Sequence, residues 1–291
     1  MARILVTGIG GPAGAAVTTL ATRRGHTVIG VDLAPPTFSS ATVCAAIPAA
    51  NDAELLPALR DLVSQHDVDL LIPTVQDELP VIAGARHHLG CQVAVSSADT
   101  VALAHDKYLT ALALAAAGVP VPATVAVAGP VTDSHAAALR KLGLPFILKP
   151  RMSRGGRGVV VVNDLADLAT IPSGSIAQTF ATGTEYAVQV YARPGHIEVV
   201  PLEKTVLKQG LVGNASHVVR RTSNEVPDVA SVAAAAAEAL GLAGPADMDI
   251  RRTVDGTPVV LEVNARFGAH STQVPEFFDW LLADHLMQVA A

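Results

Sequence analysis

The residues best suited to chemistry are acidic side chains near the end of the chain. The Asp-Gly pair at 255–256 is typical of a tight two-residue turn between apolar strands. A turn centred there places Asp249 opposite Glu262. By the same count, Asp247 lies opposite Asn264, and strand alternation puts all four side chains on one face. Because opposed like charges repel, this face predicts a divalent cation with oxygen ligands, Mg²⁺ or Mn²⁺.

Arginines close to this face leave two interpretations open. Arg266 follows Asn264 on the same face and could contact a phosphate. The alternative is a solvent-exposed polar face whose charge is balanced by Arg251 and Arg252. The metal interpretation is favoured, because the hairpin geometry itself brings the acids together.

A glycine-rich loop after Lys149 is the second candidate. Lys149 ends an apolar strand, and the loop 151–158 that follows holds three glycines and three arginines. Backbone N–H groups of such a loop can approach phosphate oxygens, and a neighbouring lysine supplies a point charge. The loop has no Gly-Lys-Ser/Thr sequence, so it is not a Walker A motif. The alternative is an exposed basic hairpin loop.

A third stretch follows the strand SIAQTF. The side-chain amide of Gln178 and free backbone groups beside Phe180 could meet an adenine edge. Glu185 could accept hydrogen bonds from ribose hydroxyls. By itself this stretch is unremarkable, and it gains meaning only beside the loop and the acids.

The N-terminal glycine turn carries a competing signal. Glycines at 8, 10, 11 and 14 lie between a strand and a helix, and Asp32 ends the next strand, as in dinucleotide-binding folds. Such turns also let a helix pack closely on a strand without any cofactor. No tyrosine is followed by a lysine four residues later, so nothing downstream supports hydride chemistry. The packing interpretation is favoured.

The order of elements predicts two differently built halves. Apolar runs alternate with helical patterns over the first hundred residues, which predicts βαβ units and a parallel sheet. The second half fits mostly antiparallel strands. The expected strands are 3–7, 26–32, 68–74, 91–96, 124–127, 145–150, 159–162, 176–190 and 197–207 before the final hairpin, and the expected helices are 12–25, 53–65, 78–89, 99–117, 133–142 and 228–240, with a last helix around Trp280.

Composition limits the possible functions. The 291 residues carry a net charge of −6, which argues against a general nucleic-acid binder because such proteins show a basic face. The apolar runs are too short to span a membrane, and Met-Ala-Arg leads directly into a strand rather than a signal peptide. Cys44 and Cys91 lie in apolar surroundings without metal-binding spacing, so we expect buried thiols in a reducing cytoplasm.

With these pieces in order, the chain resembles ATP-grasp enzymes, and most of all the carbamoyl-phosphate-synthetase-like carboxylate–amine ligases. The resemblance covers nearly the whole chain. It implies an α/β fold with a Rossmann-like pre-ATP-grasp domain over 1–104, whose parallel sheet usually holds no dinucleotide. An α+β ATP-grasp domain over 105–291 would follow, with a lid subdomain over about 120–178.

The resemblance also implies roles for individual residues. Two positions depart from the family pattern: Ala265 stands where a proline is frequent, and Gln178 where a glutamate is frequent. The ATP contacts would be Lys107, Lys149, Ser153, Gly155, Gly156, Gly158, Gln178, Phe180 and Glu185, the metal ligands Asp249, Glu262 and Asn264, and the arginine on the transferring phosphate Arg266, with Lys149 sharing the catalytic role.

The activity implied is ADP-forming ligation. A small carboxylate would be activated by ATP and Mg²⁺ as an acyl phosphate and attacked by an amine, and bicarbonate is a possible acid. Family members are often homodimers. Two other classes stay open: an NAD(P)-dependent reductase or epimerase using the glycine turn, and a non-catalytic nucleotide-binding regulator.

Candidates for the substrate pocket have weaker support. Arginine side chains suit carboxylates, but the polar segment 213–225 could equally be a mobile loop. Polar residues after the strand ending at Thr74 lie where open α/β sheets bind ligands, although helix capping explains them equally well. The candidates are His217, Arg220 and Arg221 in the polar segment, His270 and Ser271 after Arg266, and Asp77 and Glu78 after Thr74.

Overall fold

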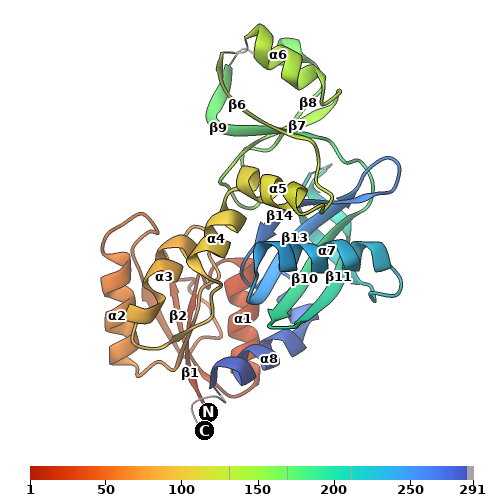
Figure 1. Ribbon diagram of the computed structural model, residues 1–291. Helices are drawn as coiled ribbons and strands as arrows, with labels where there is room; N and C mark the ends of the chain where they lie inside the picture. The colour runs from red at the N-terminus through yellow and green to blue at the C-terminus, as the bar shows by residue number, and fades with distance from the viewer. Residues whose placement is uncertain (131, 169, 211, 287–291) are drawn as a thin grey trace.

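Three sheets organise the chain in the computed structural model, which describes residues 1–130, 132–168, 170–210 and 212–286 (Figure 1). A parallel sheet forms the N-terminal part, a five-stranded antiparallel sheet lies at the centre, and a four-stranded sheet stands off from both. This confirms the expected α/β architecture. The boundary between residues 104 and 105 stays a prediction.

The first sheet is built as the apolar runs predict. Its strands are all parallel, in the order β3-β2-β1-β4-β5. Strand β3 was not expected, because it has only four residues and three of its side chains are small. The elements are β1 (Arg3–Thr7), α1 (Pro12–Arg23), β2 (Thr27–Asp32), β3 (Val43–Ala46), α2 (Leu55–Gln65), β4 (Leu70–Ile72), α3 (Leu79–Ala85), the 3₁₀ turn Arg86–His88 and β5 (Gln92–Val93).

The central sheet carries buried side chains on both faces. Even-numbered residues of strand β10 pack with helix α7, whereas Ala187 and Tyr191 pack with helices α1 and α8. Burial on both sides explains its nearly continuous apolar sequence. The order is β12-β11-β10-β13-β14. Its elements are β10 (Glu185–Arg193), β11 (His196–Gln209), β12 (Val212–Arg220), α7 (Pro227–Leu240), β13 (Gly244–Arg252), β14 (Pro258–Asn264), the 3₁₀ turn Ser271–Gln273 and α8 (Pro275–Leu286).

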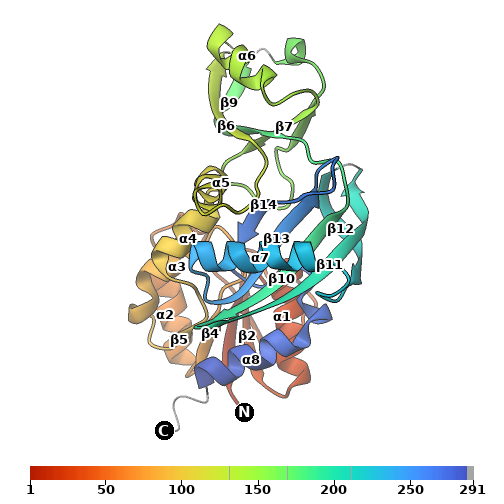
Figure 2. The ribbon, with the colours of Figure 1, turned by 45° about the vertical axis from the view of Figure 1, so that its right-hand side comes forward.

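The third sheet has its own small core and projects above the rest (Figures 1 and 2). Its strand order is β6-β9-β7-β8, with neighbours antiparallel. We call this unit the lid sheet. Its elements are β6 (Thr124–Pro130), α6 (Asp133–Arg140), β7 (Phe146–Pro150), β8 (Val160–Val162), the 3₁₀ turn Leu165–Asp167 and β9 (Thr170–Thr179).

Two expected elements are divided in the structure. The helix expected over 99–117 is two helices, α4 (Ala98–His105) and α5 (Lys107–Ala116), because the Asp106 carboxylate accepts the N–H of Tyr108 at 2.9 Å and starts a new helix. The strand expected over 176–190 breaks between Thr179 and Glu185. Gly183 lies so close to Arg252 there that a Cβ would come within 2.8 Å of it.

Two further findings concern composition. Cys44 is exposed and Cys91 is half-buried, so the expectation of two buried thiols is wrong. Cys44 lies on β3, whose outer face is open to solvent because this strand is the edge of its sheet. No helix within the described part of the chain has the length and apolar character needed to cross a bilayer.

Candidate functional site

The acidic hairpin forms with the expected pairs near the site. Asp249 pairs with Glu262, and Asp247 pairs with Asn264, across strands β13 and β14. This part of the register is confirmed. It places the four side chains on the face of the central sheet that turns away from α7.

The turn itself differs from the expectation. The loop has three residues, 254–256, because Thr253 donates its N–H to the carbonyl of Thr257 at 2.9 Å. The register shifts between Asp249 and Ile250, so Leu261 is an extra residue in β14. A longer loop and a bulge therefore offset each other, and the acids still meet.

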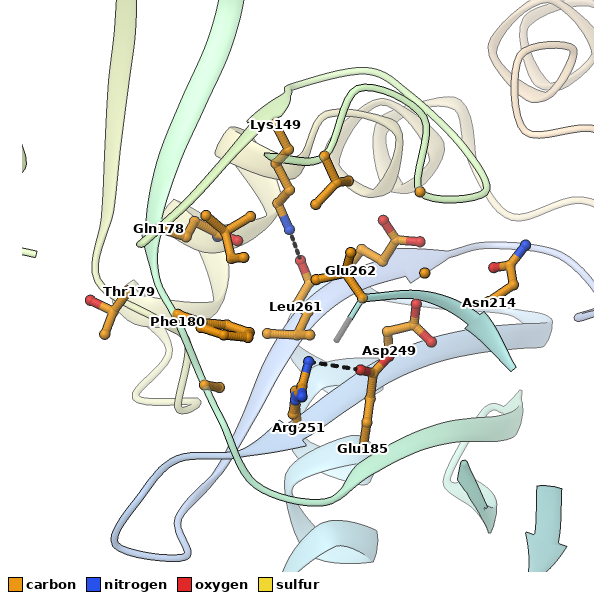
Figure 3. A pocket seen from close by; sticks show the side chains of 16 residues that line it. Lys149, Gln178, Thr179, Phe180, Glu185, Asn214, Asp249, Arg251, Leu261 and Glu262 are labelled. Carbon is orange, nitrogen blue, oxygen red and sulfur yellow. Dashed lines mark hydrogen bonds and ion pairs between the residues drawn. The ribbon is translucent and has the colours of Figure 1, made fainter. Parts of the chain in front are cut away.

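The bulge supplies an acceptor for the lysine of the lid sheet. Lys149 lies on β7, is buried, and donates from Nζ to the Leu261 carbonyl at 3.2 Å (Figure 3). Burial lowers the pKa of Lys149 to about 8, although nearby Glu262 opposes this shift. A buried lysine held by a single carbonyl is well placed to receive a phosphate.

Lys107 joins the same group from the start of α5. Its Nζ lies 3.2 Å from Glu262 Oε2 and donates to the carbonyl of Ser153 at 2.6 Å. Ser153 therefore contributes its backbone to the loop anchor. Burial opposes ionisation of Glu262, but Lys107 and Lys149 lower its pKa to about 2. The Glu262 carboxylate is thus held charged between two lysines.

A third lysine, Lys204 of β11, was missed by the sequence analysis. Its buried Nζ donates to Glu185 Oε1 at 2.6 Å and to Asp249 Oδ1 at 2.7 Å. Burial alone would lower the pKa of Lys204, but Asp249 and Glu185 raise it. The signal was weak because β11 lies far from the hairpin in the sequence. Lys204 neutralises two acids that would otherwise repel each other.

The expected adenine stretch lines a narrow pocket between the lid sheet and the central sheet. Gln178 is buried and donates from Nε2 to Thr124 Oγ1 at 2.9 Å. The guanidinium of Arg251 lies 5.1 Å from the centre of the Phe180 ring and forms an ion pair with Glu185 at 3.2 Å (Figure 3). The apolar side chains that complete this pocket are Ile147, Val159, Ala181, Val212 and Leu261.

This narrow pocket, which we call the nucleotide pocket, meets a second, larger cavity. The two share Asp249, Glu262 and Asn214, the last a residue of β12 that the sequence analysis did not select. The larger cavity, of about 1000 Å³, is enclosed by the carboxyl edge of the first sheet, the glycine loop and the hairpin face. A nucleotide in the narrow pocket would therefore present its phosphates at the shared acids, facing the larger cavity.

The glycine loop borders both spaces. Gly155, Gly156 and Gly158 all have positive φ angles, between 63° and 73°, which only glycine adopts readily. Gly156 lines the narrow pocket and Gly155 the larger cavity. The loop is anchored by Arg151, which forms an ion pair with Asp106 at 2.5 Å.

The sequence comparison decides the family. The profile of the ATP-grasp domain family matches residues 104–270, more than half of the chain. The chain belongs to the ATP-grasp family. The resemblance inferred from the motifs is confirmed, and ATP and Mg²⁺ are the nucleotide and metal of this family.

Relatives and solved structures agree with ATP-grasp membership. D-alanine–D-alanine ligases from Neisseria gonorrhoeae (strain NCCP11945) and Neisseria meningitidis serogroup B are 27% and 28% identical to the chain over 197 and 204 residues. These matches cover 63% and 65% of the chain but less than two thirds of each relative, 64% and 66%.

An L-amino acid ligase from Bacillus licheniformis superposes with a TM-score of 0.78 at 20% identity, covering 98% of this chain and 74% of that one. N5-carboxyaminoimidazole ribonucleotide synthetase from Thermotoga maritima gives a TM-score of 0.70 at 21% identity, with 99% and 76% covered. At these identities the likeness shows the fold.

The residues present fit the ATP-grasp metal. In the part of the chain that the structure describes, no three His, Cys, Asp or Glu side chains converge as a metal cluster. The donor set is instead two carboxylates, Asp249 and Glu262, and the amide of Asn264, whose nitrogen lies 3.4 Å from Glu262 Oε1. Such oxygen ligands suit Mg²⁺, which completes its shell with waters and phosphate oxygens.

Arg266 and Asp247 lie beside this donor set rather than in it. Arg266 Nη1 is 3.6 Å from Asp247 Oδ2 and donates to the Phe267 carbonyl at 2.8 Å, while its buried Nε has no partner among the described residues. Asp247 accepts from Gln189 Nε2 at 2.5 Å. Asp247, the fourth residue on this face of the hairpin, therefore already has partners within the protein.

The N-terminal glycine turn has a packing role. A Cβ at Gly14 would lie 2.1 Å from the Gly8 carbonyl oxygen, so α1 could not approach β1 with any other residue there. The Asp32 carboxylate accepts the N–H of Gly10 at 2.9 Å. Both features give the turn a packing role.

The weaker substrate candidates separate into two groups. His217 is exposed and contacts Thr205, Arg220 binds the Gln273 carbonyl and Glu276, and Arg221 binds Glu203, so none of the three lines either cavity. Residues 213–220 of the segment belong to strand β12 and are not a loop. The other group, Asp77, Glu78 and His270, does line the larger cavity. Ser271 is buried and bonds the Gly268 carbonyl.

Capping does not account for the residues after β4. Glu78 occupies the N-cap position of α3, but no side chain bonds the free N–H groups there. Asp77 forms an ion pair with Arg154 of the glycine loop instead.

Proposed function

We propose that the chain is an ATP-dependent, ADP-forming ligase that activates a small carboxylate as an acyl phosphate for attack by an amine. The observation that carries the proposal is the meeting of two spaces at one group of acids. A narrow pocket suited to a base and a roomy cavity suited to substrates share Asp249, Glu262 and Asn214. Such a junction suits phosphoryl transfer between a nucleotide and a second molecule.

The charges around the junction support this reaction. Lys149 and Lys107 approach from the nucleotide side and Arg266 from the cavity side, so negative charge on a phosphoryl group in transit would meet cations on both sides. Asp249, Glu262 and Asn264 would hold Mg²⁺, which would supply positive charge to offset that of the phosphates. The glycine loop would exclude water, which protects an acyl phosphate from hydrolysis.

The narrow pocket supports the nucleotide assignments. Gln178 and Phe180 would hold the base and Glu185 would be near the ribose, with Ser153 and the loop glycines over the phosphates. Glu185 is already bound to Lys204 and Arg251, so a ribose contact would add to these ion pairs. No nucleophilic side chain is needed, because the attacking group belongs to the substrate.

The test is ADP release from Mg-ATP with pools of small carboxylates, bicarbonate included, and amines. We expect release that depends on one acid and one amine, with Glu262→Gln as the blank. ATP binding without release from any pool would favour the regulator. Binding of NADH that is lost on substitution of Asp32 would favour the reductase or epimerase.

Two further expectations remain part of the proposal. We propose small-molecule partners, a cytoplasmic location and a homodimer. Sedimentation equilibrium would measure the dimer, and a monomer at micromolar concentration would contradict it.

A further inference from the structure

Unpaired polar atoms are concentrated at the larger cavity. Among the described residues, five buried side-chain nitrogen or oxygen atoms have no hydrogen-bond partner. Four of them, in Gln76, Glu78, His105 and Arg266, belong to residues that line this one cavity. Buried polar atoms are normally paired, so a concentration of exceptions needs a physical reason. A ligand that completes the hydrogen bonds provides one.

The unpaired atoms differ in kind between the two walls. Gln76 Oε1 and Glu78 Oε2, at the carboxyl edge of the first sheet, are acceptors. Both side chains are only 5% exposed. Arg266 Nε, on the hairpin side, is a donor. A single ligand that contacts both walls would therefore carry hydrogen-bond donors at one end and acceptors at the other.

Glu78 is buried although it forms no ion pair among the described residues. Its side chain caps no helix N–H, and the nearby guanidinium of Arg154 forms its ion pair with Asp77. The side chain of Thr7 hydrogen-bonds to the Glu78 carboxyl group, but Oε2 of that group still has no partner among the described residues. Burying an unpaired polar atom costs stability, so the position favours a ligand over the unliganded fold.

We propose that Gln76 and Glu78 bind the protonated amino group of a substrate whose carboxylate faces Arg266, so that the acid activated by this enzyme is a zwitterionic amino acid. This inference rests on the proposed function. An ammonium group held by Glu78 keeps its proton and cannot act as the attacking amine. The amino acid in this subsite is therefore the acid partner, and its amino group is protected while its carboxylate reacts.

Binding measurements test the subsite without relying on turnover. Calorimetric titration compares L- and D-alanine with propionate, L- and D-leucine with 4-methylpentanoate, and L- and D-glutamate with glutarate. We expect the wild-type protein to bind at least one amino acid ~10–100-fold more tightly than its counterpart without the amino group, as for a charge-assisted hydrogen bond. Glu78→Gln should abolish this preference, and Gln76→Leu should reduce it.

The matched control is Glu54→Gln. Glu54 occupies the N-cap position of α2, also without a side-chain cap, but it is exposed and is not one of the residues that line the cavity. This variant should keep the wild-type preference. Thermal unfolding provides the second readout: Glu78→Gln should melt at or above the wild-type temperature, because it removes a buried ionisable group while an amide can keep the hydrogen bond with Thr7. A residue with a merely structural role would lower the melting temperature.

The outcomes separate the two proposals. Loss of the preference in Glu78→Gln with an unchanged or higher melting temperature supports the subsite. Equal binding of amino acids and their counterparts by the wild type overturns it, as does a preference that survives in Glu78→Gln or no binding of any probe. ATP binding, measured in the same samples, tests the proposed function alone, because the subsite residues lie outside the narrow pocket.

Discussion

The nucleotide pocket and the larger cavity differ in how far their buried polar groups are paired within the protein. In the nucleotide pocket each acid has a protein cation: Glu262 meets Lys107, while Glu185 and Asp249 share Lys204. In the larger cavity, Glu78 and Arg266 each keep a buried polar atom that has no partner in the described part of the chain. The first region is preorganised before any ligand binds, and the second needs a ligand to satisfy it.

This difference separates stability from function. Breaking an ion pair in the nucleotide pocket leaves an uncompensated buried charge, so the fold itself should suffer. Removing an unpaired group from the cavity should leave the fold unharmed and impair only binding. Substitutions in the two regions should therefore change the free energy of unfolding in opposite directions.

The largest expected effect is that of Lys204→Met. It leaves Glu185 and Asp249 buried side by side without their shared cation, which should cost about 3–5 kcal/mol of the free energy of unfolding. Urea unfolding at neutral pH measures this loss. Lys208→Met, on the same strand but exposed, is the control and should unfold like the wild type. An unchanged midpoint in Lys204→Met would mean that the pocket is not held together by its ion pairs.

Glu262→Gln should affect catalysis more than folding, because Lys107 loses its ion pair but keeps its hydrogen bond to the Ser153 carbonyl. Removing one charged group that stabilises phosphoryl transfer typically costs ~10²–10³ in rate. We expect that loss in ADP release once the acid substrate is known, with a circular dichroism spectrum like that of the wild type. The exposed Glu238→Gln serves as the control. Turnover near the wild-type rate would remove Glu262 from the metal site.

Sequence reasoning reached the acids because the information is local. Side chains alternate in direction along two adjacent strands, so a two-residue turn pairs Asp249 with Glu262. A three-residue turn gives the same pair when a bulge adds one residue to a strand, as it does here. The bulge itself was not predictable. Lys204 and Asn214 were missed because they come from strands whose position beside the hairpin depends on the whole sheet.

The same limit explains the remaining errors. In the sequence, the neighbouring Arg220 and Arg221 resemble a carboxylate-binding site. In the structure, Arg220 forms an ion pair with Glu276 of α8, and Arg221 forms one with Glu203 of β11. The break at Asp106 was hidden because both flanking segments favour helix. The fold class was predictable, since the alternation of strands and helices sets it without any long-range detail.

Glu78, in the wall of the larger cavity, should make the free energy of unfolding depend on pH. Burial raises the pKa of Glu78 to about 7 from 4.5, although the hydrogen bond with Thr7 opposes this shift. Asp32 and Asp77 add to the shift in pKa, and Arg154 opposes it. Between these values the folded protein keeps a proton that the unfolded chain has lost. The free energy of unfolding should therefore fall as pH rises through this window, by roughly 3 kcal/mol in total.

Glu78→Gln isolates that contribution. The difference in free energy of unfolding between variant and wild type should grow in favour of the variant from pH 4.5 to pH 7. Urea unfolding across this range provides the measurement. Parallel curves for the two proteins would show that Glu78 ionises normally and that the cavity wall is well solvated.

The smallest expected effect concerns the ion pair between the glycine loop and the cavity wall. Asp77 and Arg154 are 46% and 35% exposed, so Asp77→Asn should change the free energy of unfolding by less than about 1 kcal/mol. The pair nevertheless ties the loop to the first sheet above the cavity. Its loss should therefore speed tryptic cleavage after Arg154 or Arg157 a fewfold, since local opening precedes cleavage.

The surface pair between Arg3 and Asp67 provides the control for this last experiment. Its side chains are 51% and 78% exposed, and it lies away from the loop. Asp67→Asn should leave cleavage of the glycine loop unchanged. Equal cleavage rates in both variants would mean that the loop closes without help from the cavity wall. A faster rate in Asp77→Asn alone, slowed again by ATP, would mean that the two regions are coupled through this loop.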